Sequence, residues 1–456
     1  MIKIPAGLKL QPGEEKNLWQ EISAHPDRVS RYRKLARLLE RRNRPREAVV
    51  VLRRALKKIP ADRPREVLDV RKQIARDYES AGDDRMAIRE YRKLIRQYPE
   101  EWVPYERLER VYSRRDRKGE MIKIYRAVKK GNPQRERALK KLVRLETSLE
   151  NFVSARSDLK KLIREFGPEY MRLKDLGRLY EKTGNLKSAI AAYKKALKLK
   201  PRNPDLELMI GVSRRKSGQR QQARKAFREI LNHTPGWYGS HIHLAEMDIE
   251  DGRHRSAEEH FKKIDSRFPG NSRVAINRAR ILLEEGKPGE ALELARPAAA
   301  QTPFYYTDEL SLGHQVLADA HAALGQPGEA GYHSLMARRI RGCRDYFAAT
   351  IEVVDELIAA DDLDLADRVA DGLLERYPVN SLARIKKAEI ARRRGDFDRA
   401  VSLAVEASRE SNPRYLNDKI RALELLSELY GEKGEKKKSE DCRRLAQDLS
   451  AHPPEK

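Results

Sequence analysis

Histidines gather in one stretch of the chain, and imidazole is both a common zinc ligand and a common general base. The five residues are His233, His241, His243, His254 and His260. His241 and His243 are two residues apart in a segment that we expect to be helical, so their side chains point to different sides. His243 and Glu246 could share a face, but two ligands do not make a metal site. The spacing therefore predicts no metal site in this stretch.

Four aspartates in the second half of the chain resemble part of a calcium-binding loop. They are Asp361, Asp362, Asp364 and Asp367. The glycine and the distal glutamate that such a loop requires are absent. Aspartate also caps helix N-termini, which is the interpretation that this spacing favours. No GxxxxGK[ST], GxGxxG, HExxH or GxSxG motif occurs. The sequence thus predicts no catalytic residue, no metal ligand and no cofactor, and the protein is expected not to be an enzyme.

Charge is distributed unevenly along the 456 residues. Residues 1–230 hold 62 Lys and Arg against 31 Asp and Glu, whereas residues 231–456 hold 34 against 39. The whole net charge of +26 therefore comes from the first half. Solubility or heat adaptation would require both signs in rough balance, which the first half lacks. A basic surface of this kind favours an anionic partner.

Neither the apolar residues nor the cysteines indicate export or a membrane. No run of 18 apolar residues occurs, and the first ten residues lack the apolar stretch of a secretion signal. Cys343 and Cys442 have no metal-like spacing and are expected to be free thiols. These observations favour a cytoplasmic protein without a transmembrane segment.

A 34-residue period runs through much of the chain. Six prolines keep it: Pro99, Pro133, Pro201, Pro235, Pro269 and Pro303. Glycines keep the same spacing at Gly184, Gly218, Gly252 and Gly286, as do alanines at Ala189, Ala223, Ala257 and Ala291. A fixed period of this length indicates one helical unit repeated, each burying its apolar face against the next. The architecture should therefore be all-α.

The segment from Tyr170 to Asn203 contains one complete repeat. Its distinctive positions are Leu176, Gly177, Tyr180, Gly184, Ala189, Tyr193, Ala196 and Pro201. Glycine permits the turn that ends the first helix, and proline ends the second. In period, order and alternation of small and large residues, this segment resembles a tetratricopeptide repeat. The resemblance covers nearly the whole chain and implies a right-handed superhelical solenoid of helix-turn-helix repeats.

The same frame predicts twelve repeats within residues 29–453. They begin near residues 29, 68, 102, 136, 170, 204, 238, 272, 311, 347, 381 and 420. Insertions near Pro64 and Pro413 indicate longer first helices rather than new domains. Residues 1–28 form an N-terminal extension with a short capping helix at Glu14–Ala24, and residues 454–456 form a tail.

Two positions of each first helix, the fifth and the ninth, are four residues apart and share one face. The resemblance implies that this face lines the concave groove where tetratricopeptide proteins bind peptides. In the first five repeats the two positions are basic with the single exception of Glu106. The predicted partner-binding residues are Arg33, Arg37, Lys72, Arg76, Arg110, Lys140, Arg144, Lys174 and Arg178. In later repeats the fifth position is mostly apolar and the ninth mostly acidic.

The resemblance and the charge together predict a non-enzymatic scaffold or adaptor that binds a protein or an extended peptide of acidic character. The lysine–asparagine–arginine clamp that some family members use for C-terminal carboxylates lacks its asparagines here, which favours a longer acidic segment. Nucleic-acid or other polyanion binding by residues 1–230 is the alternative, since phosphates require only cations. Self-association is a third hypothesis, and a basic face that is merely solvated is the alternative without a binding role.

Overall fold

The computed structural model describes residues 4–451 apart from residues 6, 61, 116, 304–305, 342, 344 and 410–414. Every regular element in this described part is a helix. The chain divides into two compact units, residues 1–230 and residues 231–456. The tail predicted at 454–456 lies outside the described residues.

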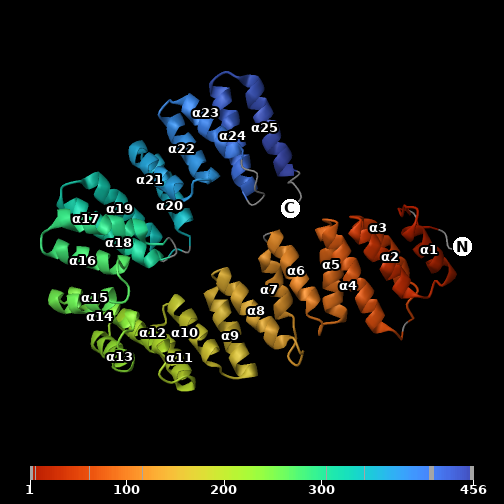
Figure 1. Cartoon of the computed structure of the whole chain (residues 1–456), viewed down its shortest axis with the longest axis horizontal. Helices are drawn as coiled ribbons and strands as arrows, with labels where there is room; N and C mark the ends of the chain where they lie inside the picture. Colours follow the sequence, from red (N-terminus) through yellow and green to blue (C-terminus); the bar gives the residue numbers. More distant parts are fainter. Residues whose placement is uncertain are drawn as a thin grey trace. The chain divides into compact units, whose positions relative to one another are not determined.

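Unit 1 is a row of helices in which each of α1 to α11 contacts the helix that follows it in the chain (Figure 1). Its elements are α1 (Glu14–Ala24), α2 (Val29–Arg41), α3 (Pro45–Leu56), α4 (Pro64–Ser80), α5 (Asp84–Gln97), α6 (Val103–Arg114), α7 (Lys118–Arg126), α8 (Arg135–Ser148), α9 (Phe152–Phe166), α10 (Tyr170–Lys182), α11 (Leu186–Leu199), α12 (Pro204–Lys216) and most of α13 (Arg220–His233).

Unit 2 repeats this arrangement, and each helix from α14 to α25 contacts the next. Its elements are α14 (Tyr238–Glu250), α15 (His254–Asp265), α16 (Ser272–Glu284), α17 (Pro288–Gln301), α18 (Thr307–Ala323), α19 (Pro327–Ile340), α20 (Tyr346–Ala359), α21 (Leu363–Arg376), α22 (Ser381–Arg393), α23 (Phe397–Ser408), α24 (Leu416–Glu432) and α25 (Lys436–Ala451).

The helices from α2 onward alternate between a first and a second helix of a hairpin. Nine of the first helices begin within one residue of a predicted repeat start. The other three, α4, α18 and α24, begin earlier, because proline or polar residues at the inserted positions add a turn at the N-terminus. A glycine with a left-handed backbone follows many of the first helices, as at Gly184 and Gly218, where φ is +73° and +77°. After α2, α8 and α20 the left-handed residue is Asn43, Glu150 or Asp361.

The two helices of a hairpin cross closely where small residues face an aromatic ring. Ala189 and Tyr193 of α11 are completely buried. A Cβ atom built on Gly177 of α10 would lie 2.2 Å from the Tyr193 ring, so only glycine fits there. One period later, a Cβ atom on Gly211 would lie 2.4 Å from the Phe227 ring. The repeated pair of glycine and aromatic residue therefore sets the distance between the helices.

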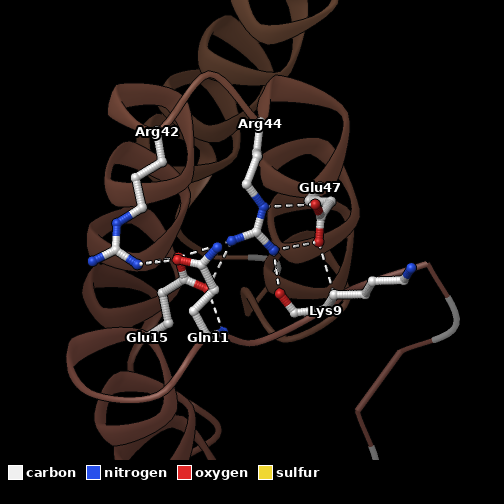
Figure 2. A network of polar contacts seen from close by, with 6 residues as sticks. All are labelled: Lys9, Gln11, Glu15, Arg42, Arg44 and Glu47. Atoms are coloured by element: carbon white, nitrogen blue, oxygen red, sulfur yellow. Dashed lines mark hydrogen bonds and ion pairs between the residues drawn. The ribbon is translucent and has the colours of Figure 1, made fainter.

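The N-terminal segment is fastened to the first hairpin by a buried polar network (Figure 2). Glu15 of α1 is fully buried and accepts hydrogen bonds from Arg42 at 2.6 Å and from Arg44 at 2.9 Å. Arg44 also forms two hydrogen bonds of 2.7 Å with Glu47, whose carboxylate accepts the Lys9 amide at 2.8 Å. Burial by itself raises the pKa of Glu15, but the hydrogen bonds outweigh it and hold that pKa below its usual range. The network thereby ties α1 to the turn between α2 and α3.

Candidate basic partner-binding surface

A pocket of about 240 Å³ in unit 1 contains three of the predicted partner-binding residues. Arg33 of α2 and both Lys72 and Arg76 of α4 line it. These helices are the first helices of consecutive hairpins, which is why residues almost forty positions apart meet on one face. The rest of the lining is Asp69, Tyr91, Val103, Pro104 and Arg107. The other predicted residues lie outside this pocket, on α2, α6, α8 and α10.

Most cations at the fifth position already have a carboxylate partner within the chain. Arg33 lies 3.5 Å from Asp69, and Lys72 is paired with Glu101. Lys140 lies 2.7 Å from Glu136 on its own helix. Their positive charge is therefore partly neutralised before any partner binds.

The ninth position behaves differently, because all five of its arginines are exposed. Arg178 lies 3.7 Å from Asp175. The other four form no ion pair with any residue that the structure describes, and they are Arg37, Arg76, Arg110 and Arg144. An exposed guanidinium without a carboxylate partner keeps all of its forked donors available for an external anion. These four arginines, one on each of α2, α4, α6 and α8, are named the arginine row below.

Several residues of this surface could not be identified from the fifth and ninth positions alone. Arg107 adds a further cation to the pocket and lies 3.7 Å from Glu79, while Asp69 adds the only carboxylate among the lining residues. Val103 is 48% exposed and gives the pocket an apolar wall together with Pro104. Val103 and Arg107 are four residues apart on α6, and Asp69 lies one turn before Lys72 on α4, so the pocket forms where the packing of successive hairpins brings these two helix faces together.

A buried carboxyl lies directly beside the arginine row. Asp77 of α4 is completely buried, and neither of its oxygens has a hydrogen-bond partner in the described part of the chain. Burial raises its pKa to about 7, the charge of Glu40 adds to this, and Arg76 opposes it. The group is therefore partly protonated in the folded protein at neutral pH, whereas in the unfolded chain it is ionised above pH of about 4.

Replacing Asp77 by Asn is expected to stabilise the protein at pH 8 and to have little effect at pH 4. The pKa of Asp77 is higher in the folded protein than in the unfolded chain, so a protonated carboxyl favours folding. This contribution to the free energy of unfolding is complete below the unfolded pKa and is lost as the pH rises through about 7. A neutral amide of the same shape removes this loss, which is on the order of 2–4 kcal/mol. Urea unfolding of the unmodified protein and the Asp77→Asn variant at pH 4 and pH 8 measures the difference in their free energy of unfolding. The exposed control Glu229→Gln should change stability little at either pH, and a gain of equal size at pH 4 and pH 8 would contradict the prediction.

On the corresponding face of unit 2, acidic and basic side chains form ion pairs with one another. A pocket of about 1000 Å³ is lined by residues of the fifth and ninth positions of α20, α22 and α24, namely Asp355, Ile385, Glu389, Glu424 and Glu428. Lys386 lies 2.8 Å from both Asp355 and Glu389, and Arg392 lies 2.6 Å from Glu428. The basic excess of the chain thus belongs to unit 1, whose boundary at residue 230 coincides with the change in net charge.

Sequence models of the tetratricopeptide repeat match residues 73–101, 177–218, 205–236, 248–307 and 354–415. With the helical hairpins and the 34-residue period described above, these matches show that the chain belongs to the tetratricopeptide-repeat family. The prediction of an all-α tetratricopeptide fold is confirmed. Proteins of this family are interaction scaffolds that bind peptides or proteins. No curated protein matches the sequence significantly.

Several solved structures of tetratricopeptide proteins are similar to this chain at low identity. One from Parabacteroides merdae is 14% identical, covering 64% of this chain and 99% of its own, with a TM-score of 0.36. Yeast Tom70 is 15% identical over 89% of this chain and 96% of its own, with a TM-score of 0.34. YrrB, described as having an unusual peptide-binding site, is 16% identical over 40% of this chain and 93% of its own, with a TM-score of 0.32.

The described helices were also compared with the length and hydropathy that a membrane span requires. None of them is both long enough and apolar enough to cross a bilayer.

Proposed function

We propose that the protein is a non-enzymatic adaptor whose unit 1 binds an extended acidic segment of a partner protein along the arginine row. The observation that carries this proposal is the set of exposed arginines without an ion-pair partner among the described residues, at one equivalent position of four successive hairpins. Most cations of the fifth position on the same face have carboxylate partners, so the unpaired charge of this face lies mainly in the arginine row. Aspartate and glutamate side chains accept the two parallel hydrogen bonds that a guanidinium donates.

Two features of the surface favour an acidic peptide over a nucleic acid. The pocket beside Arg76 has an apolar wall at Val103 and Pro104, which suits an aliphatic side chain between carboxylates. The aromatic rings nearby are unavailable for base stacking, because Tyr91, Tyr105 and Tyr112 are each at most 1% exposed. Backbone phosphates could still bind the cations alone, so nucleic-acid binding is the alternative that the experiment must separate.

The proposal is tested with two labelled probes of equal charge, measured by fluorescence anisotropy at rising salt. One is an acidic peptide of about twelve residues with interspersed leucines, which spans about 40 Å when extended. The other is a single-stranded RNA. The peptide is expected to lose less affinity than the RNA between 50 and 200 mM salt, since its apolar contacts are not screened. Single-stranded RNA that contacts six or more cations should lose about 300-fold or more of its affinity over this range.

Tighter binding of the RNA than of the peptide at 200 mM salt would overturn the adaptor proposal in favour of polyanion binding. Light scattering of the free protein over the same salt range tests self-association. Dimers that dissociate into monomers when the acidic peptide is added would show that a second copy of the chain normally covers the arginine row.

A further inference from the structure

A second group of side chains in unit 2 has the composition of a metal site. His321, Glu329 and His333 each offer a ligand atom, and these three atoms all lie within 4.8 Å of one another. His321 belongs to the last turn of α18, whereas Glu329 and His333 belong to α19. The two residues of α19 are four apart and therefore share one face, and α18 packs directly against α19. Two helices of one hairpin thus bring the three groups together across their turn.

The ring of His321 has one nitrogen without a partner. Its Nδ1 lies 2.6 Å from Oε1 of Gln326, an oxygen that only accepts, so Nδ1 carries the hydrogen. The lone pair of the imidazole is consequently on Nε2. The residue is 3% exposed, and its buried Nε2 has no hydrogen-bond partner in the described part of the chain. A buried acceptor in this condition is costly unless something binds it.

The other two groups are held as metal ligands usually are. Nδ1 of His333 lies 2.9 Å from Nδ1 of His314, and when it donates this hydrogen bond its Nε2 is left to bind a cation. Oε1 of Glu329 is paired with Arg368 of α21, which leaves its second oxygen available. The ring centroids of His321 and His333 are 5.4 Å apart. Two imidazoles bound to one zinc ion through nitrogens at about 2.0–2.1 Å place their centroids about 5 Å apart.

An earlier hairpin of the same chain provides an internal comparison. Its histidines at the same two positions, His241 and His260, form the same Nδ1 to Nδ1 contact at 2.9 Å. The position that corresponds to the unpartnered histidine holds Asp248, whose carboxylate accepts hydrogen bonds from Arg253 at 2.8 Å and from Ser256 at 2.5 Å. The histidine pair is therefore a packing feature that both hairpins share. The later hairpin has His321 in place of Asp248 and Glu329 in place of Ser256, and Arg368 of α21 engages only Oε1 of that glutamate.

We propose that His321, Glu329 and His333 bind a zinc ion that clamps α18 to α19 in unit 2. Two imidazoles and one carboxylate are a common set of three protein ligands for zinc, with water in the fourth position. Magnesium and calcium prefer all-oxygen ligands and do not suit this set. The ion would satisfy the buried Nε2 and join the end of one helix to the start of the next. This site is independent of the partner proposed for unit 1.

The test is a zinc titration of the untagged, metal-free full-length protein by calorimetry, combined with elemental analysis and thermal unfolding. We expect one ion per chain at this site and a higher temperature of unfolding with zinc. Cobalt(II) in place of zinc should give the visible absorption of a tetrahedral site. Glu329→Gln removes one ligand with little change in shape and should weaken zinc binding by at least about tenfold.

The matched control is Glu290→Gln, because Glu290 occupies the same first-turn position of α17. It should bind zinc as the unmodified protein does. A second variant, His321→Gln, should also lose the cobalt absorption, with circular dichroism used to check its helix content. The proposal is overturned if the unmodified protein binds no stoichiometric zinc, or if both variants bind it with unchanged affinity.

Discussion

Reversal of Arg76, Arg110 and Arg144 to glutamate is expected to weaken binding of an acidic peptide to unit 1 strongly without changing the helix content. None of the three is engaged in an ion pair within the described residues, so the substitutions break no such internal contact. An exposed arginine–carboxylate pair contributes about 0.2–1 kcal/mol, and a reversed charge adds repulsion of similar size. Three reversals together should therefore cost about 1–6 kcal/mol, a loss of roughly 10- to 10,000-fold in affinity.

The control for this experiment carries the same change of charge on another face. Lys187, Lys194 and Lys195 are exposed residues of α11, a second helix. Their reversal to glutamate should weaken the peptide only modestly, through the general field of unit 1. Fluorescence anisotropy with the acidic peptide compares the two triple variants. Equal losses would show that the basic unit acts by bulk charge and that the arginine row has no special role.

Replacing Gly177 by Ala is expected to be strongly destabilising although it adds a single methyl group. The new Cβ atom would lie 2.2, 2.5 and 2.7 Å from atoms of the Tyr193 ring. That ring is completely buried and cannot move aside without opening the crossing of α10 and α11. Overpacking of this kind costs about 1–3 kcal/mol, and the short contact places Gly177→Ala at the upper end. Urea unfolding of the full-length chain measures the effect, and Gly211→Ala should behave similarly.

A second glycine in unit 1 gives the opposite expectation. Gly119 lies in α7 with an ordinary backbone, and a Cβ atom there would meet nothing within 4 Å. Gly119→Ala should therefore stabilise the protein by up to about 1 kcal/mol, because alanine favours the helix. If Gly177→Ala and Gly119→Ala change the free energy of unfolding in the same direction, the prediction that Gly177 packs tightly against the Tyr193 ring is wrong.

The 34-residue period was enough to predict the helical hairpins, because each repeat must bury the same apolar face against its neighbours. Small residues and aromatics recur at fixed positions, so Gly177 and Tyr193 could be assigned to the helix crossing before any coordinates were known. The net charge of each half likewise follows from composition alone. The same frame also indicated which side of each first helix is exposed, and all five arginines of the ninth position are indeed exposed.

Tertiary structure alone decided which charges have partners in other repeats, whereas a pair on one helix, such as Lys140 with Glu136, follows from spacing. Lys72 meets Glu101 of the next hairpin, which spacing within one helix cannot reveal, and Arg76 does not meet such a partner among the described residues. The same holds for His321, whose approach to Glu329 and His333 depends on the turn between two helices. Periodicity determines which face a residue occupies, whereas the packing of different helices determines the distances on which pairing and ligation depend.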